Sequence, residues 1–229
     1  MVTRATDAVR EIERLGAAYP ECHTTAQDVT ITLRVLREGP EVQSHLRIER
    51  ALWPLKLIGT GLRCFIVPIQ PQWAEQLFDD MPQGNLFKNS LLTLRPENAY
   101  YRKAKPHVLS APARVLWYVS TDAPGAMALR ANSYIDEVIV DVPKEVFRRF
   151  RRLGIYSWNE VFKTADYELS NEIMAFQFSK TELSRNPVAW DRLQETLLKH
   201  VGKKNQIISP VEIPEECFLE LYRLGMYGA

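Results

Sequence analysis

Two short segments in the middle of the chain restrict its fold most strongly. Residues 115–120 and 135–142 alternate side chains with the period of two that is typical of a β-strand. They flank a loop of small and polar residues at 120–125. The pattern predicts two walls of a small barrel or sheet with a polar mouth, and it places Trp117 with its valine neighbours in the core.

Composition limits the partners that the whole molecule can attract. The 229-residue chain has a hydrophobic fraction of 46% and a charged fraction of 25%, which are ordinary for a globular protein. Its net charge of +1 gives no global attraction to nucleic acid or to a membrane, so such binding needs a local patch. No apolar run approaches the ~20 residues that span a bilayer. We therefore expect no membrane partner and a cytoplasmic location.

Cysteines and histidines are too scattered to predict a metal site. The three cysteines include no C-x-x-C pair, and the four histidines lie far apart in the chain. This distribution also argues against a disulfide framework. We expect no metal and no cofactor.

Strands and helices follow one another without regular β-α-β alternation. This order favours an α+β fold, built as a mixed β-barrel with peripheral helices, over a doubly wound sheet. Residues 1–59 contain an expected helix at 7–18 and an expected strand at 29–36, which is too little for an independent domain. We expect 1–59 to be an N-terminal arm or a truncated remnant, and 60–229 to form the main domain.

The C-terminal third contains three local signals. Ser157 and Glu160 have the spacing of a capping box that opens a short helix. Residues 206–208 are apolar enough to predict a short strand after a turn. The last helix is expected to begin at Pro214 and to end at Gly225.

Four pieces of the main domain carry a family resemblance. They are Val67–Asp79, Tyr100-Tyr-Arg, Val115–Ser120 and Ser133–Val138. Together they resemble the PUA-like superfamily and, within it, the ASCH-type domains. Residues 50–229 are also similar to the C-terminal region of bacterial proteins in which such a domain follows a GNAT acetyltransferase domain. The resemblance implies a pseudo-barrel whose cleft takes RNA or modified nucleotides and, in some relatives, hydrolyses its ligand.

Two motifs of these families are missing. The ASCH signature G-x-K-x-x-E-x-R is replaced by Leu94–Arg102, in which Arg102 keeps the last position and Glu97 lies near the acidic one. No residue there matches the catalytic lysine. The acetyltransferase motif is also absent, because Tyr156 would block the close backbone approach that a small residue allows at a pyrophosphate.

A local excess of positive charge lies between Lys88 and Arg114, with six cations and one acidic residue. Arginine and lysine pair with phosphates, and the nearby tyrosines offer faces on which bases stack. Polar and aromatic side chains from the following strands would hold a base and bind its edges. We predict a nucleic-acid-binding surface made of Arg95, Tyr101, Arg102, Lys103, Lys105, Tyr118, Ser120, Arg130, Asn132 and Ser133. The alternative is a solvated loop whose tyrosines belong to the core.

A second basic surface is expected on the helix that follows. It consists of Lys144, Arg148, Arg149, Arg151 and Arg152, and it would follow a phosphate backbone. The alternative is a solvated helix face whose charge is balanced by nearby acids, namely Asp141, Glu145 and Glu160.

The function that these patterns favour is binding of RNA or single-stranded DNA, at a modified or unpaired base. A first alternative is a small nucleoside hydrolase or ribonuclease, with Glu97 and either Lys103 or Lys105 as an acid/base pair. Thr93 or Ser120 would then be the nucleophile. A second alternative is a non-catalytic interaction remnant of an acetyltransferase-linked protein, which would form a homodimer through its N-terminal arm.

Overall fold

The computed structural model describes residues 2–4, 41–78, 97–120 and 127–228. The helix expected at 7–18 and the strand expected at 29–36 lie outside these ranges. The chain divides into two compact units, Met1–Leu62 and Arg63–Ala229.

The first unit contains a helix and a two-stranded parallel sheet. Helix α3 spans Glu41–Ala51, and strand β1 (Val2–Arg4) pairs with strand β2 (Lys56–Ile58). The carboxylate of Glu49 on α3 is fully buried and accepts a hydrogen bond of 2.6 Å from the backbone N–H of Leu57. This contact fixes the helix against β2.

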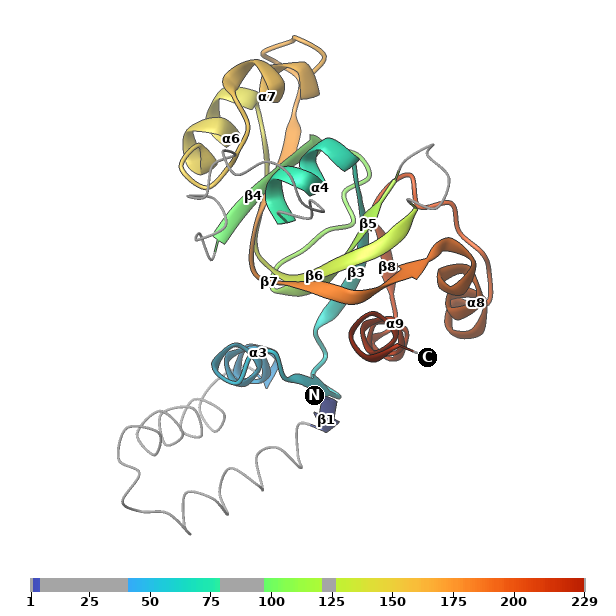
Figure 1. The fold of residues 1–229 in the computed structure, drawn as a ribbon. Helices are drawn as coiled ribbons and strands as arrows, with labels where there is room; N and C mark the ends of the chain where they lie inside the picture. The colour runs from blue at the N-terminus through green and yellow to red at the C-terminus, as the bar shows by residue number, and fades with distance from the viewer. Residues whose placement is uncertain (1, 5–40, 79–96, 121–126, 229) are drawn as a thin grey trace, which may run out of the picture. The chain divides into compact units, whose positions relative to one another are not determined.

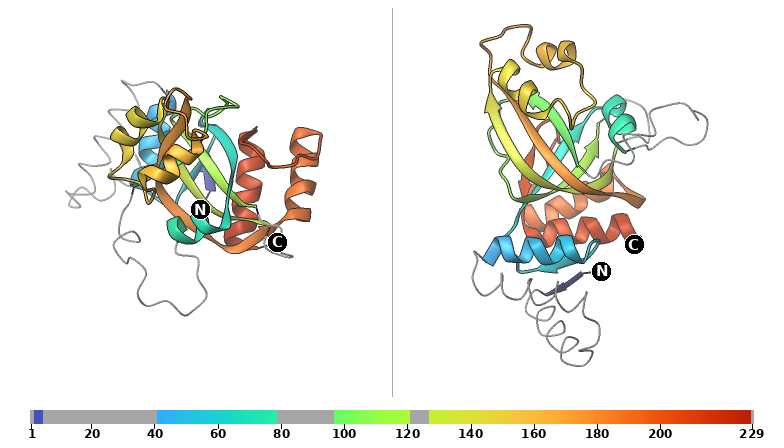
Figure 2. Two further views of the ribbon diagram at one scale, coloured as in Figure 1. Left: turned by 90° about the horizontal axis from the view of Figure 1, so that it is seen from above. Right: turned by 90° about the vertical axis from the view of Figure 1, so that its left-hand side faces the viewer.

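A six-stranded mixed sheet forms the centre of the second unit (Figure 1). The strand order is β4-β7-β6-β5-β3-β8, and β3 with β5 is the parallel pair in it. The sheet curls strongly (Figure 2), but the pairing leaves β4 and β8 as its two edges, so the barrel is open in the described part of the chain. The predicted α+β fold with a mixed sheet is confirmed. The strands are β3 (Arg63–Ile69), β4 (Glu97–Lys103), β5 (Ala113–Val119), β6 (Ala128–Asp141), β7 (Ile173–Ala189) and β8 (Val211–Ile213).

The concave side of the sheet holds the main hydrophobic core. Trp117 on β5 is fully buried there, as its alternation with valine predicts. Its ring stacks on Phe176 at 5.8 Å and meets Tyr100 edge-on at 5.6 Å. Its indole N–H donates to Ser133 Oγ at 2.9 Å, which satisfies the buried donor.

Helices α8 (Trp190–Val201) and α9 (Glu215–Tyr227) pack together beside the sheet (Figure 1). Beneath α9, the guanidinium of Arg114 is fully buried and forms a 2.8 Å ion pair with Glu215. The same guanidinium lies 5.5 Å from the ring centre of Phe218. A buried cation is tolerated here because it has both a carboxylate and an aromatic partner.

Two expectations for this region are wrong. Residues 206–208 form no strand, and β8 at Val211–Ile213 pairs with β3 instead. Gly225 does not end the last helix, which continues to Tyr227. Gly225 is a packing residue, because a Cβ there would lie only 2.9 Å from Ser184 Oγ on β7.

The remaining helices are α4 (Pro71–Phe78), α6 (Pro143–Phe150) and α7 (Trp158–Thr164). Helices α6 and α7 form an insertion between β6 and β7, at the end of the sheet near β4 (Figure 1). The predicted capping box at the start of α7 is present, because Ser157 N–H donates to Glu160 Oε2 at 2.7 Å and Ser157 Oγ accepts from Glu160 N–H at 3.4 Å. Among the described helices, none has the length and hydropathy needed to cross a membrane.

Candidate functional site

Four aromatic rings meet where α4, β4 and the α6–α7 connection come together. We call Trp73, Tyr100, Tyr101 and Tyr156 the aromatic cluster. The ring of Tyr156 lies 4.3 Å from Trp73, 5.1 Å from Tyr101 and 6.1 Å from Tyr100, measured between ring centres. Such tilted and edge-on contacts are the arrangements that aromatic rings prefer.

The edge position of β4 brings these rings together. Adjacent residues of a strand point to opposite faces, so Tyr100 and Tyr101 are on different sides of the sheet. The segment after α6 runs along the outer edge of β4, where Ala99 N–H donates to Leu153 O at 3.2 Å. Gly154 allows this approach, because a Cβ there would lie 3.3 Å from the Tyr101 ring. Tyr156 is thereby within reach of both tyrosines.

Two hydroxyl groups of the aromatic cluster are buried without a partner. Tyr101 is 4% exposed and Tyr156 is 7% exposed, and neither hydroxyl has a hydrogen-bond partner within the described structure. A buried polar group left unpaired costs about 1–3 kcal/mol. Most buried hydroxyls in proteins are satisfied, so these two are available to a ligand or to an ordered water.

The phenols of the cluster remain protonated at neutral pH. Burial raises the pKa of Tyr100 to about 12, although the positive charge of Arg102 acts in the opposite direction. Burial also raises the pKa of Tyr101 and of Tyr156, the latter with contributions from neighbouring phenols and Glu160. Each hydroxyl can therefore donate one hydrogen bond and accept others. The cluster offers ring faces together with polar atoms in apolar surroundings.

The predicted cations of β4 are only partly available to a ligand. The Arg102 guanidinium donates to the carbonyl oxygens of Lys105 and Pro106, at 3.2 and 3.3 Å, so it stabilises the turn after β4. Burial lowers the pKa of Arg102 from its ordinary value. Lys103 forms an exposed ion pair of 2.8 Å with Asp166. Lys105 is exposed, and Arg95 lies outside the described residues.

The other predicted residues do not form one pocket. Tyr118 lies under α8, with its ring 5.6 Å from that of Trp190, and Asn132 donates to Glu182 O at 3.3 Å. Ser133 belongs to the opposite face of the sheet, where it contacts Trp117. The expectation that these side chains line one pocket is therefore wrong, because neighbours in a strand face opposite sides.

Two further predicted residues lie near the ends of these strands. Ser120 follows β5, is partly buried, and its hydroxyl contacts Ile69 O at 3.4 Å. Arg130 is partly buried in β6, at a point where the pairing register with β7 shifts. Among the described residues, Ser120 forms no hydrogen bond with the aromatic cluster.

The basic surface of α6 is partly neutralised by acids. Arg148 pairs with Glu145, and Arg149 pairs with Glu137 at 3.0 Å. Glu137 was not among the acids expected to balance this face, whereas Glu160 is used in the capping box. Lys144, Arg151 and Arg152 are exposed.

The proposed acid/base pair is not assembled. Glu97 and Lys103 are at opposite ends of β4, roughly 20 Å apart in an extended strand. The carboxylate of Glu97 instead accepts a 2.9 Å hydrogen bond from Gln177. Thr93 lies outside the described residues. In the described ranges, no group of three or more His, Cys, Asp or Glu side chains could hold a metal ion.

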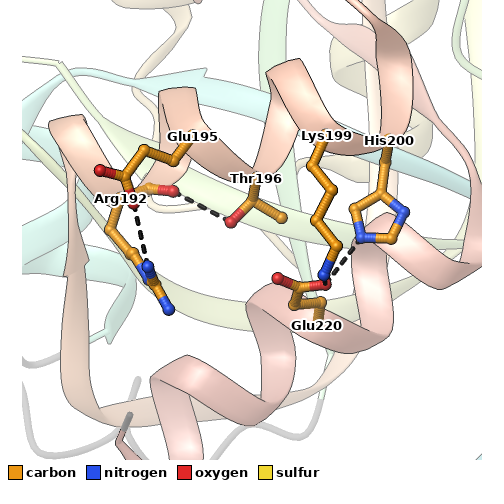
Figure 3. Close-up of polar contacts among 6 residues, drawn as sticks. All are labelled: Arg192, Glu195, Thr196, Lys199, His200 and Glu220. Carbon is orange, nitrogen blue, oxygen red and sulfur yellow. Dashed lines mark hydrogen bonds and ion pairs between the residues drawn. The ribbon is translucent and has the colours of Figure 1, made fainter.

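A charged contact that the sequence did not indicate joins α8 to α9 (Figure 3). Glu220 Oε2 lies 2.6 Å from Lys199 Nζ and 2.7 Å from His200 Nε2. Hydrogen bonds from Lys199 and from His200 lower the pKa of Glu220. Lys199 and His200 belong to α8 and Glu220 belongs to α9, so this contact stabilises the packing of the two helices.

Comparison with known proteins identifies the fold. No family model and no curated protein matches the sequence. Among solved structures, the ASCH protein of Zymomonas mobilis is similar with a TM-score of 0.51 at 14% identity, over 70% of this chain and 94% of that chain. A single-residue mutant of the same protein gives a TM-score of 0.52 at 15% identity, over 70% of this chain and 97% of that one. The chain therefore has an ASCH-like fold, as the resemblance implied, and the similarity to GNAT-linked proteins stays a prediction.

Proposed function

We propose that this protein binds nucleic acid and holds an unpaired base at the aromatic cluster. The observation that carries the proposal is the pair of buried hydroxyls on Tyr101 and Tyr156, which have no partner in the described structure and lie among tilted and edge-on rings. A base has an aromatic face and an edge of donors and acceptors, so it matches both properties of this cluster. The ASCH-like fold and the resemblance to PUA-like domains support the same ligand class.

Trp73 marks the side from which a ligand reaches the cluster. It is only partly buried, while the three tyrosines are buried. Base stacking on an aromatic side chain contributes about 1–3 kcal/mol, and each hydrogen bond to a phenol about 0.5–1.5 kcal/mol. Together these contacts are sufficient for selective binding of a base that is not paired in a duplex.

The test is a fluorescence-anisotropy titration with labelled single-stranded RNA and DNA at low salt. Tyr101→Phe and Tyr156→Phe remove one oxygen each and keep the rings, so each should weaken binding about 2- to 10-fold. The matched control is Tyr222→Phe, which removes a buried hydroxyl on α9 that donates to Glu182 at 3.1 Å. Its affinity should equal that of the wild type.

Two results would remove the proposal. One is that neither RNA nor DNA binds at low salt. The other is that both Tyr101→Phe and Tyr156→Phe bind with unchanged affinity. Comparing the affinities for the RNA and DNA probes also identifies the preferred nucleic acid, since contacts to the 2′-hydroxyl distinguish RNA from DNA.

A further inference from the structure

A second group of rings lies on the α6–α7 insertion, where Trp158 and Tyr167 are exposed and Phe147 and Phe162 are partly buried. Phe147, Trp158, Phe162 and Tyr167, which we call the aromatic row, follow one another at ring-centre distances of 5.5, 5.6 and 5.7 Å. Trp158 and Phe162 are stacked, with 9° between their planes. Trp158 is 37% exposed and Tyr167 is 54% exposed. Contiguous exposed aromatic side chains commonly mark an interaction site.

The backbone holds this row in place at a cost in free energy. The capping box fixes the start of α7 at Trp158, and Phe162 follows one turn later. After the helix, Asp166 and Tyr167 have φ values of 55° and 61°, in the left-handed region that residues other than glycine rarely adopt. The hydrogen bond from Tyr167 N–H to Phe162 O, 3.0 Å long, stabilises this turn. In this turn the Tyr167 ring lies edge-on to the Phe162 ring.

Positive side chains accompany the row on α6. Lys144, Phe147 and Arg151 have the i, i+3, i+7 spacing that places them on one face of the helix. Val146 and Phe150 lie on the other face of α6 and are buried against the sheet. Among the described residues, Lys144 and Arg151 form no ion pair, whereas Arg148 and Arg149 do. Two exposed cations therefore flank the partly buried ring of Phe147 on one side of the helix.

The row is continuous in sequence with the aromatic cluster. Tyr156 packs inward against Tyr101, and Trp158, two residues later, is exposed beside Phe147. A strand whose base lies at Tyr156 therefore has its next nucleotides close to Trp158. Rings that stack bases, combined with cations that contact phosphates, are the usual means of binding single strands.

We infer that the aromatic row and the Lys144–Arg151 face bind the nucleotides that flank the base held in the aromatic cluster. The inference rests on the proposed function and adds an extended single-strand path to it. Duplexes are disfavoured on this path because their bases are stacked inside the helix. Binding should therefore depend on strand length and on salt.

The experiment compares a labelled mixed-sequence trinucleotide with a labelled 12-nucleotide single strand, each as RNA and as DNA. Wild-type protein should bind the 12-nucleotide strand at least about 10-fold more tightly. Trp158→Leu keeps an apolar contact with Phe162 but removes the stacking face, so it should weaken 12-nucleotide binding about 5- to 100-fold. Trinucleotide affinity and the melting temperature should stay close to wild type.

A double variant tests the phosphate contacts. Lys144→Gln with Arg151→Gln should reduce the slope of log Kd against log salt by about 1.4, since each phosphate contact to a single strand contributes about 0.7. The matched control, Lys203→Gln with Arg223→Gln, removes two exposed cations elsewhere in the same unit. Its slope should not change.

The outcomes separate the inference from the proposed function. Equal affinity for the two lengths, or wild-type affinity in both Trp158→Leu and the Lys144/Arg151 variant, would overturn the inference alone. In that case the effects of Tyr101→Phe and Tyr156→Phe would persist. Absence of binding to both probes would overturn the proposed function as well.

Discussion

At the scale of single residues, the hydroxyls of Tyr101 and Tyr156 do not contribute to the stability of the fold. Their hydroxyls are buried and unpartnered in the described structure, while the comparable hydroxyl of Tyr222 donates to Glu182. Phenylalanine would pack as well as tyrosine at the first two positions and would avoid the desolvation of a polar atom. Under the proposed function, these two oxygens bind the ligand.

This contrast predicts opposite effects on stability. Tyr101→Phe and Tyr156→Phe should leave the free energy of unfolding unchanged or raise it by about 1 kcal/mol, because no hydrogen bond is lost. Tyr222→Phe should lower it by about 1 kcal/mol, because Glu182 loses a donor. Urea denaturation followed by circular dichroism measures all three. A clear loss of stability in both Tyr101→Phe and Tyr156→Phe would mean that the hydroxyls are paired in solution.

The limits of sequence-based prediction are also visible at this scale. Alternation correctly placed Trp117 in the core because β5 pairs with β3 without a register shift from Ala113 to Val119. The pairing of Tyr101 with Tyr156 could not be predicted, because it depends on the path of the segment after α6 along β4. Gly225 was misassigned as a helix end, because a glycine required for close packing has the same sequence signal as a C-terminal cap.

At the scale of elements, the helices of the second unit form two groups with different contacts. Helices α8 and α9 pack on each other, on β7 and on other strands of the sheet, and they bury Arg114 and Tyr118. The α6–α7 insertion lies near β4 and leaves Trp158 and Tyr167 of its aromatic row exposed. Helix positions were predictable from apolar spacing and the capping box. The contacts of β8 were not, since three residues carry too little periodicity to identify a strand.

The contact between α8 and α9 predicts a stability change with acid. The partners Lys199 and His200 lower the pKa of Glu220 from its ordinary value of 4.5. The contribution of the Glu220 carboxylate to folding stability is therefore fully present above about pH 4.5. It is lost as the pH falls through the lowered pKa of the folded state. Glu220→Gln should reduce stability at pH 7 by about 0.5–1 kcal/mol, because the group is partly exposed.

Thermal unfolding of Glu220→Gln and wild type across pH 2 to 7 checks this expectation. The difference between the two should shrink as the pH falls, since protonated glutamic acid resembles glutamine. Arg192→Gln is the control, because its ion pair with Glu195 lies within α8 (Figure 3) and does not join the helices. A difference in melting temperature between Glu220→Gln and wild type that stays constant with pH would contradict this stabilising role of the Glu220 carboxylate.

At the scale of the whole molecule, the second unit has a sheet and a hydrophobic core of its own. Its six described strands pair in one sheet, and the main core cluster consists of residues between Phe65 and Phe178. The fold class was predictable from the order of elements, because irregular alternation of strands and helices excludes a doubly wound sheet. The gap between the edge strands β4 and β8, which leaves the barrel open, was not predictable, since closure of a barrel depends on the geometry of strand pairing.

Residues 63–229 expressed alone should therefore fold. We expect a single cooperative unfolding transition by calorimetry, and an affinity for the 12-nucleotide strand within about 3-fold of that of the full chain. A fragment with near-native far-ultraviolet circular dichroism but no cooperative transition would show that packing of the core depends on residues 1–62.

The most direct test of the central claim is photo-crosslinking of a single strand that contains 4-thiouridine or 5-iodouracil, followed by mass spectrometry of the crosslinked peptides. A base held in the aromatic cluster predicts crosslinks to Trp73, Tyr101 or Tyr156 that are lost when unlabelled single strand competes. Crosslinks confined to peptides from α8 and α9, with none on the aromatic cluster, would contradict the account.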